Sequence, residues 1–383
     1  MLALLLLLMA SVSLAEDQLL SARHYGVLQG LPDQTAMDIV QDQNQQIWLS
    51  TSNGLAKFNG QSFEVIRNQP GDKNSVLGNS ISSIEMVNQD MWLLVEEMGL
   101  SKYHAKEKQF EHMVSVTPND QSHLLNSDIF AITSDLTGRL FVFQFNAGVS
   151  IKRADSDLLV HHTKENSDWL NSLMFFDAEV SEDNQLWAVT LDGMALHWDL
   201  NNDSKKWFQV VDDQRAGANG LYDVTIDSKG QVWASGYAGV YQFDEQTGQF
   251  IAVVSEQQIS EFFGKHVSVR SSYHDDKGNL WLATLDGLLR FDNGQLNSIT
   301  FMISSQKKLK HLYVNKVFED HEHNLWILTM EQGVFVVGGQ WQHQNIIPLK
   351  QDGDSIKAAA VIAKAHHDRL YLSHEFSPKI EVF

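Results

Sequence analysis

The sharpest local cluster of potential metal ligands is the run Asp320-His321-Glu322-His323. In an extended chain, His321 and His323 would lie on one side and offer two imidazole ligands. The run also has the composition of a solvated turn between two strands, and the turn is the favoured interpretation. We therefore expect no metal site there.

No motif of a known catalytic chemistry is present. The chain lacks a Gly-x-Ser-x-Gly nucleophile elbow, a phosphate-binding glycine loop and a His-Glu-x-x-His zinc motif. Its acidic turns also lack the spacing of an EF-hand calcium loop. The sequence therefore predicts no catalytic residue, no cofactor and no enzymatic activity for this chain.

A second set of candidates lies in seven short turns that each lead into a glycine. They are Asn53, Glu96, Glu97, Asn146, Asp192, Tyr237, Asp286 and Glu331. Several are acidic, so a face on which they gather would carry a negative rim suited to a cation, an amine or a hydroxyl-rich ligand such as a carbohydrate. The alternative is that these tips are polar only because they are solvated.

Aromatic residues in the two longest connections are further candidates. They are Trp169, Phe175, Phe176, Phe262 and Phe263. Their rings would stack on a sugar or a peptide, or else pack beneath their own loops. Which of these two arrangements occurs depends on the strands that position the connections.

An internal repeat sets the position of all these turns. Its marks are Trp48, Trp92, Phe141, Trp187, Trp233, Trp281, Trp326 and Tyr371. Successive marks are 44, 49, 46, 46, 48, 45 and 45 residues apart, and an apolar residue precedes each one. In the first seven units a glycine follows the mark six or seven residues later. A period of this length is typical of propeller blades.

Each unit has the pattern of a four-stranded meander. In the first unit, strands are expected at 40–42, 48–51, 55–58 and 62–66. Aspartate in the first turn can bond its own backbone, and Gly54 can supply the positive φ that a tight hairpin needs. Four antiparallel strands repeated radially make an all-β propeller, with each marked tryptophan wedged between neighbouring blades.

The N-terminal residues predict how the ring closes. Residues 21–25 have the pattern of a lone outer strand, which would complete the blade containing Trp326. This closure gives seven blades within residues 16–340 and leaves residues 341–383 as the start of a second propeller. Closure by pairing the two ends of the repeat array is a known way to remove the open edges of a sheet.

The alternative is an eighth blade. It would be built from the strands around Val361, Tyr371 and Ile380 and completed by the same N-terminal strand. This last unit lacks the tryptophan, the aspartate and the glycine of the others, so seven blades are favoured.

Residues 1–15 differ in composition from the rest of the chain. They are nearly all apolar and end in Ser13-Leu14-Ala15, a small-x-small pattern before a cleavage point, which predicts a signal peptide and a location outside the cytoplasm. The net charge of −20 argues against binding to nucleic acid or to an anionic membrane. The chain has no cysteine, so disulfides and thiolate metal sites are excluded.

The repeat resembles that of two-component regulator propellers, with the pattern Asp-x-x-Gly-x-Leu-Trp-Leu-x-Thr-x-x-Gly-Leu-x-x-Phe. Residues 275–291 show it nearly complete, and residues 42–58 are close to it. The lead-in residues 30–32 and 70–81 match as well. The resemblance covers roughly residues 21–375, and the third and fourth units match it least.

The resemblance implies a ligand-sensing propeller of a bacterial receptor in the periplasm. Such repeats form the sensor part of hybrid two-component sensors and sensor diguanylate cyclases, in which paired propellers are followed by a β-sandwich, a membrane helix and an output module. The sequence shows none of these later parts. We therefore expect binding of a small ligand without turnover, in a fragment or truncated homologue that works with a membrane-bound partner or a missing C-terminal output domain.

Two rival hypotheses are a lyase of the streptogramin-inactivating kind, whose propeller repeats are similar, and a non-catalytic scaffold or adhesion propeller. The identity of the ligand and the formation of a homodimer are left open by the sequence.

Overall fold

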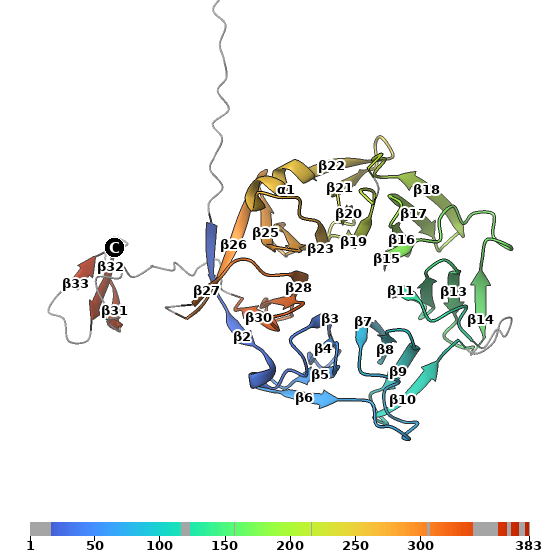
Figure 1. Cartoon of the computed structure of the whole chain (residues 1–383), viewed down its shortest axis with the longest axis horizontal. Coiled ribbons are helices and arrows are strands. Elements are labelled where there is room, and N and C mark those ends of the chain that lie inside the picture. Colours follow the sequence, from blue (N-terminus) through green and yellow to red (C-terminus); the bar gives the residue numbers. More distant parts are fainter. Residues whose placement is uncertain are drawn as a thin grey trace, which may run out of the picture. The chain divides into compact units, whose positions relative to one another are not determined.

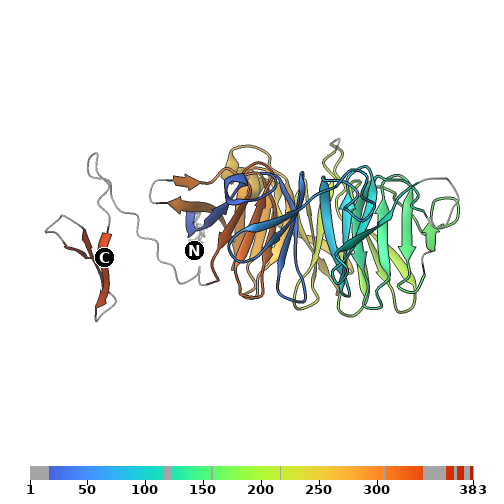
Figure 2. The ribbon, with the colours of Figure 1, turned by 90° about the horizontal axis from the view of Figure 1, so that it is seen from below.

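The chain forms a seven-bladed β-propeller (Figure 1). The computed structural model describes residues 17–115, 123–156, 158–215, 217–304 and 307–339, and three strands between residues 359 and 382. Each blade is built on four strands, of which β3, β7, β11, β15, β19, β23 and β28 lie nearest the centre of the ring (Figure 1). The strands run between the two faces of the ring (Figure 2). The predictions of an all-β propeller and of seven blades are confirmed.

The first four blades are plain meanders. Blade 1 consists of β3 (Ala36–Gln41), β4 (Ile47–Thr51), β5 (Gly54–Phe58) and β6 (Phe63–Ile66). Blade 2 consists of β7 (Ile81–Val87), β8 (Asp90–Val95), β9 (Gly99–His104) and β10 (Gln109–Met113). Blade 3 consists of β11 (Ile129–Ser134), β12 (Leu140–Gln144), β13 (Gly148–Lys152) and β14 (Leu159–His162). Blade 4 consists of β15 (Phe175–Val180), β16 (Gln185–Thr190), β17 (Met194–Asp199) and β18 (Ser204–Gln209).

The last three blades carry additions. Blade 5 consists of β19 (Leu221–Ile226), β20 (Val232–Gly236), β21 (Gly239–Asp244) and β22 (Gln249–Ser255), followed by helix α1 (Glu256–Phe263). Blade 6 consists of β23 (Val269–His274), β24 (Leu280–Thr284), β25 (Gly287–Asp292) and β26 (Gln295–Ser304), with β1 (Asp17–Ser21) and β27 (Lys307–Leu309) added to β26. Blade 7 consists of β28 (Val314–Glu319), β29 (Leu325–Thr329), β30 (Val334–Val337) and β2 (Arg23–Tyr25). A 3-10 turn, η1 (Val27–Gln29), links β2 to blade 1.

A hydrogen-bonded clamp repeats in the first hairpin of the blades. The aspartate of the turn accepts a hydrogen bond from the indole N–H of the marked tryptophan. The pairs are Asp42–Trp48 at 2.9 Å, Asp227–Trp233 at 3.2 Å, Asp275–Trp281 at 3.0 Å and Asp320–Trp326 at 2.7 Å. In blade 3, where Phe141 replaces the tryptophan, Asp135 instead accepts from Arg139 Nε at 2.5 Å. The clamp thus fixes the aspartate of the turn to the buried tryptophan of the core.

The marked aromatics of the seven blades pack into the space between blades. Trp48 lies in one buried cluster with Ile84 and Tyr103 of blade 2, and the fully buried Trp281 lies with Val317 of blade 7. This confirms the predicted wedge. Gly54 also acts as expected: its φ is +127°, and a Cβ there would lie 2.9 Å from the carbonyl oxygen of Ile66.

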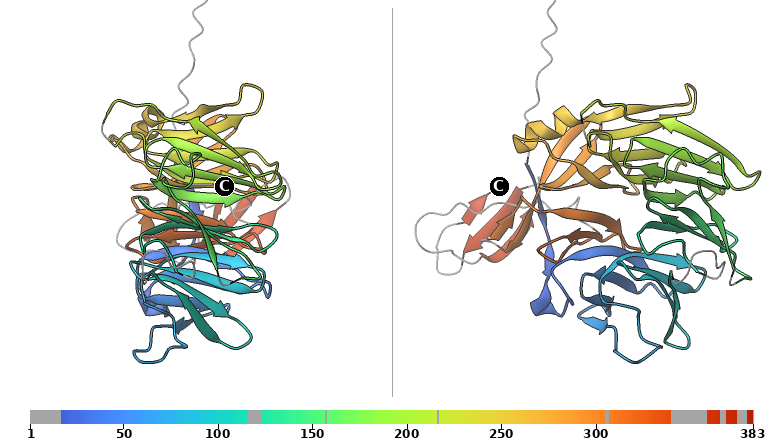
Figure 3. Two further views of the ribbon diagram at one scale, coloured as in Figure 1. Left: turned by 90° about the vertical axis from the view of Figure 1, so that its right-hand side faces the viewer. Right: turned by 45° about the vertical axis from the view of Figure 1, so that its right-hand side comes forward.

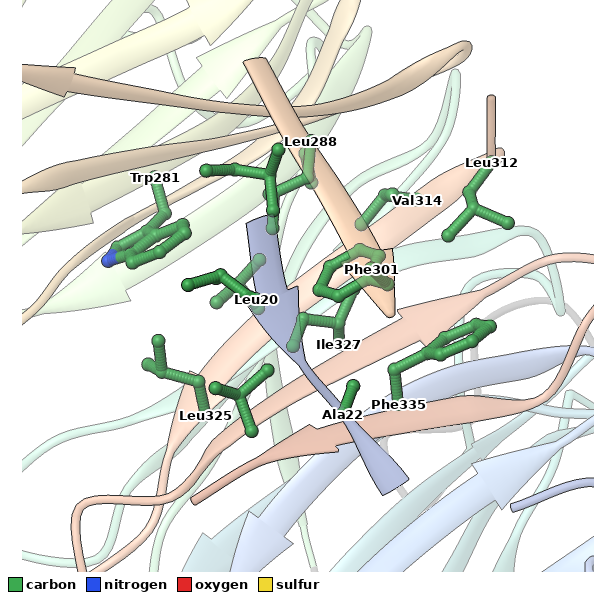
Figure 4. Packing of buried hydrophobic residues seen from close by; sticks show 14 residues of the cluster. Leu20, Ala22, Trp281, Leu288, Phe301, Leu312, Val314, Leu325, Ile327 and Phe335 are labelled. Carbon is green, nitrogen blue, oxygen red and sulfur yellow. The ribbon is translucent and has the colours of Figure 1, made fainter. Parts of the chain in front are cut away.

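The N-terminal segment closes the ring across two blades (Figures 1 and 3). β1 pairs in parallel with β26 of blade 6, and β2 pairs antiparallel with β30 of blade 7. Leu20 and Ala22 are buried in one cluster with Phe301 and Phe335, whose rings stack at 5.4 Å (Figure 4). The predicted closing strand is confirmed. Because it completes blade 7, the alternative of an eighth blade completed by this strand is wrong.

Residues 345–383 form a separate unit. It contains β31 (Ala359–Ala365), β32 (Arg369–His374) and β33 (Ile380–Val382), paired antiparallel in chain order. That residues 341–383 begin a second propeller stays a prediction. The signal-peptide prediction for residues 1–15 lies outside the described residues. Among the described helices, none has the length and apolar character needed to cross a bilayer.

Candidate functional site

All seven inner strands carry a β-bulge at their second residue. The register shifts there in every blade, between the first and third residue of the strand. A bulge turns the side chain of the extra residue away from the regular alternation and is a common way to aim a side chain at a site. These bulge residues are Met37, Ser82, Phe130, Phe176, Tyr222, Arg270 and Asn315. They share one face of the ring, here called the entry face, on which inner strands begin and second strands end.

Aromatic rings gather at the bulges of blades 3 to 5. Phe130 and Phe176 lie 5.4 Å apart between ring centroids, Phe176 and Tyr222 also 5.4 Å, and Phe145 lies 5.1 Å from Phe130. We call these four residues the aromatic arc. Phe130 is 40% exposed, although a phenylalanine gains free energy by burial. The arc is therefore an apolar surface open to a ligand.

Arg270 extends the arc from blade 6. Its guanidinium carbon lies 5.1 Å from the ring centre of Phe176 and 5.5 Å from that of Tyr222. These distances are those of cation–π contacts, which are strongest where water is excluded. Arg270 thus reaches past blade 5 to blade 4, on the side of the ring that faces its centre.

The residues just below the bulges tie neighbouring inner strands together. Asp38 Oδ2 accepts from the backbone N–H of Ile84, Asp177 Oδ2 from that of Val224, and Asp223 Oδ2 from that of Ser272, each at 2.9 Å. These three contacts join blade 1 to blade 2, blade 4 to blade 5, and blade 5 to blade 6. The carboxylates at the centre of the ring are therefore part of its framework.

Burial and mutual repulsion raise the pKa of several central acids. Burial raises the pKa of Glu85 to about 7. Burial and then Asp177 raise the pKa of Asp223 to about 7, and burial followed by Asp177 and Asp223 raises that of Glu179 to about 8. A group of close carboxylates cannot all ionise readily in a low-dielectric interior.

Lys316 is the cation among these acids. Its Nζ lies 2.5 Å from Asp38 Oδ1, and its side chain is 41% exposed, which shows that water reaches the centre of the ring. Burial alone would lower the pKa of Lys316, but Asp38, Asp177 and Asp223 outweigh this effect and raise it. The charged ammonium is thus held in place.

The eight turn residues predicted from the sequence lie on the entry face, but they are spread around the ring. Several have protein partners: Glu96 Oε2 accepts from Ser80 Oγ at 2.5 Å, and Asp192 Oδ1 from Ser172 Oγ at 3.0 Å. The backbone oxygen of Asn53 accepts from Arg67 Nε. Glu97 and Asn146 have positive φ angles of 58° and 54°, which suits a turn. Glu331 is exposed.

Positive groups interrupt the predicted negative rim beside blades 5 and 6. Asp286 lies 2.9 Å from Lys265 and 3.2 Å from His311. Tyr237 stacks on His266 at 3.9 Å, and His266 Nδ1 lies 2.8 Å from Glu256, which also pairs with Arg215 at 2.6 Å. Ligand binding by the eight turn residues stays a prediction.

Four of the five aromatic residues predicted in the long connections pack within the protein. Phe175 is fully buried, and Trp169 lies 5.0 Å from Trp198. Phe262 and Phe263, on α1, pack against the core between blades 5 and 6. Phe176 belongs to the arc. The sequence analysis missed Arg270, Phe130, Phe145 and Tyr222.

A positional signal for the bulge residues does exist in the sequence. The bulge residue lies eleven positions before the aromatic mark in six blades and ten positions before it in blade 2. This position was not singled out, because a bulge is not visible in an alternating pattern. Its residue types differ between blades, so it carries no repeat signature.

His321 and His323 are not brought together as a pair of ligands. His323 Nδ1 instead lies 2.9 Å from Glu319 and 3.0 Å from Asp276 of blade 6. The hydrogen bond to Glu319 raises the pKa of His323, which favours the charged form of the imidazole beside these two carboxylates.

Surface grooves also lie away from the arc. One of about 750 Å³ lies between blades 1 and 2 and is lined by Trp48, Met86 and Tyr103. These three side chains belong to the core between the two blades, so its deep wall is part of the fold. The arc is the better candidate because its rings belong to none of the buried clusters between blades and Phe130 is exposed.

No protein-family model matches the chain. A stretch of 49 residues is 41% identical to the histidine kinase P4 of Formosa agariphila, which amounts to 13% of this chain and 4% of that protein. A match of this length identifies one repeat.

Solved structures similar to the chain include extracellular domains of hybrid two-component systems. The domain assigned to BT3049 of B. thetaiotaomicron gives a TM-score of 0.73 at 22% identity, over 95% of this chain and 48% of that one. The domain assigned to BT4673 gives 0.66 at 15% identity, over 92% and 44%. Streptogramin B lyase gives 0.58 at 11% identity, over 83% and 97%. The chain spans about half the length of the two sensor domains, and the resemblance inferred from the repeat is confirmed at the level of fold.

Proposed function

We propose that this chain is the ligand-sensing propeller of an extracytoplasmic bacterial receptor, and that a small ligand binds on the aromatic arc without turnover. The observation that carries the proposal is the gathering of aromatic side chains, half-buried except for the exposed Phe130, at the bulges of adjacent blades beside Arg270. Convergent aromatic and polar groups on a rigid scaffold are typical of small-ligand sites.

The extracytoplasmic location is supported by the apolar residues 1–15 and by the fold shared with extracellular sensor domains. In a receptor of this kind, binding at the propeller is passed to an output module. We propose that a domain beyond Phe383 or a membrane-bound partner supplies that module.

An enzyme is the rival that the fold shared with streptogramin B lyase supports. A lyase needs a general base within reach of its substrate, with a pKa near the working pH. The arc itself offers phenylalanines, Arg270 and Tyr222, and burial raises the pKa of that tyrosine. The carboxylates just below, Asp177 and Asp223, accept backbone hydrogen bonds between blades, and although the pKa of Asp223 is raised to about 7, this residue is buried and joins blade 5 to blade 6. This arrangement favours binding over turnover.

The test is ligand-observed NMR on the purified chain with a panel of neutral and acidic oligosaccharides, organic acids and amines. The variant carries Phe130→Ala and Phe176→Ala. Leu136→Ala is the matched control, because Leu136 is 69% exposed and lies in a turn on the opposite face. We expect at least one compound to bind the parent and the control, to lose binding in the double variant, and to be recovered unchanged.

Three outcomes would overturn the proposal. Conversion of a bound compound would make the chain an enzyme. Binding that survives the double variant would place the site elsewhere, and failure of every panel member to bind would remove the case for the arc as a ligand site.

A further inference from the structure

We propose that Arg270 makes the aromatic arc selective for anionic ligands, namely molecules that carry a carboxylate or sulfate group on a ring with an apolar face. This inference rests on the proposed function and adds the chemical class of the ligand. It also departs from the cation, amine or neutral sugar expected from the acidic turns.

Arg270 lacks a counter-ion within the part of the chain that the structure describes. Its Nε is shielded from water and has no hydrogen-bond partner there. Other arginines of this acidic protein do have carboxylate partners, as Arg139 has Asp135 and Arg215 has Glu256. Arg270 differs from an exposed arginine because its Nε is shielded from water, and desolvating a guanidinium N–H without an acceptor is unfavourable.

The adjacent residue leaves a second polar group unpartnered. Ser271 is 8% exposed, and its Oγ has no hydrogen-bond partner among the described residues. Ser271 occupies the strand position equivalent to that of Asp38, Asp177 and Asp223. A donor that lies next to Arg270 and has no protein acceptor suits a ligand oxygen.

The acids nearest in sequence to the arc do not neutralise Arg270. One carboxylate oxygen of Asp177 and one of Asp223 each accept a hydrogen bond from a backbone N–H of the next blade. Burial also raises the pKa of Asp223 to about 7, which reduces its negative charge near neutral pH and so its repulsion of an anion.

The arc therefore offers two complementary features to one ligand. The planar guanidinium can bind a carboxylate or sulfate through two parallel hydrogen bonds. The exposed face of Phe130 and the neighbouring Phe145 can take a flat ring or the apolar face of a pyranose. Acidic sugars and aromatic acids share this chemistry.

Calorimetric titration with two matched pairs of probes tests the inference and distinguishes an aromatic acid from an acidic sugar as the ligand. One pair is 2-naphthoate and 2-naphthamide, and the other is a glucuronate-terminated disaccharide and its glucose-terminated counterpart. The variants are Arg270→Gln, which removes the charge, and Arg270→Lys, which keeps the charge without the planar fork. Arg153→Gln is the control, because Arg153 is exposed in the loop between β13 and β14.

We expect the anionic member of at least one pair to bind the parent at least about tenfold more tightly than its neutral counterpart. Arg270→Gln should abolish this preference, Arg270→Lys should reduce it, and Arg153→Gln should leave it unchanged. Equal binding of both members, or a preference that survives Arg270→Gln in a protein with an unchanged melting temperature, would overturn the inference while the arc stays a ligand site. Binding of no probe, or binding unaffected by Phe130→Ala with Phe176→Ala, would overturn both proposals.

Discussion

The two halves of the entry face differ in side chains on a common backbone. Blades 3 to 6 carry Phe130, Phe176, Tyr222 and Arg270 at the bulge of the inner strand, whereas blades 7, 1 and 2 carry Asn315, Met37 and Ser82. All seven bulges lie at the same register position. The repeat thus supplies the same backbone geometry seven times, whereas the aromatic and charged side chains of the candidate site are confined to one half of the ring.

The opposite face is more uniform, because there the same contact recurs in four consecutive blades. The clamp between aspartate and tryptophan appears in blades 1, 5, 6 and 7 with little change in distance. Residues that repeat should therefore affect stability when changed, and residues that differ between blades should affect binding.

The largest expected effect comes from Trp281→Ala. The side chain is fully buried between blades 6 and 7, so its removal should destabilise the ring by about 3–5 kcal/mol. Urea unfolding followed by circular dichroism measures this change. A loss no greater than that caused by Phe176→Ala would contradict the separation of repeated and differing residues.

Asp275→Ala should cost about 1–3 kcal/mol, because it leaves the buried indole N–H and turn N–H groups without an acceptor. Asp275 accepts from Trp281 Nε1 at 3.0 Å and from the backbone N–H of Asn279 at 2.9 Å. The control is Asp276→Ala, which removes an exposed carboxylate next in the chain and should change stability by less than about 1 kcal/mol. Equal losses for the two variants would show that the clamp contributes nothing.

Phe176→Ala and Met37→Ala compare the two halves directly. Phe176 contacts Phe130, Tyr222 and Arg270, so its loss should weaken binding of 2-naphthoate by about three- to tenfold. Met37→Ala changes the equivalent position of blade 1 and should leave binding unchanged. Titration calorimetry gives the dissociation constant of 2-naphthoate for each variant. A similar loss of affinity in both variants would place the ligand across the whole ring.

The last prediction concerns pH and the centre of the ring. The pKa of Glu179 is raised by burial, and then by Asp177 and Asp223, from 4.5 to about 8. The folded protein therefore binds a proton in this window that the unfolded chain has lost, and stability falls as the pH rises from 5 to 8. Glu179→Gln should make this decline shallower.

Urea unfolding at pH 5, 6.5 and 8 measures the decline. Glu182→Gln, at an exposed residue of blade 4, serves as the control and should keep the slope of the parent. An unchanged slope in Glu179→Gln would show that this carboxylate is already ionised in the folded protein at pH 5.

The sequence predicted the fold well because the fold depends on local signals. The aromatic mark and the glycine recur in all seven blades at intervals of 44 to 49 residues, the turn aspartate recurs in five of them, and the closing strand predicted at residues 21–25 contains β2. Helix α1 was not predicted, although Ser255 and Gln258 form a capping box and Gly264 ends the helix. The parallel strand β1 was missed because its partner, β26, is distant in the sequence.

The candidate site was predicted only in part, because the directions in which its side chains point depend on tertiary structure. The turn residues share the entry face with the aromatic arc, but their partners, such as Lys265 beside Asp286, come from other loops. Arg270 meets Phe176 across an intervening blade, and no local pattern encodes such a contact. The bulge that directs both side chains is likewise a property of strand pairing.

The seam at blade 7, where β2 pairs with β30, constrains the order in which the parts of the chain fold. β2 is made near the start of synthesis, yet its partner β30 follows only after six blades have been made. Contacts between residues so far apart form late, because the whole intervening chain must first be brought into place. We therefore expect joining of the seam to be the final step of folding, and a chain cut short before Val334 to leave β2 without its partner and β29 as an unpaired edge open to other molecules.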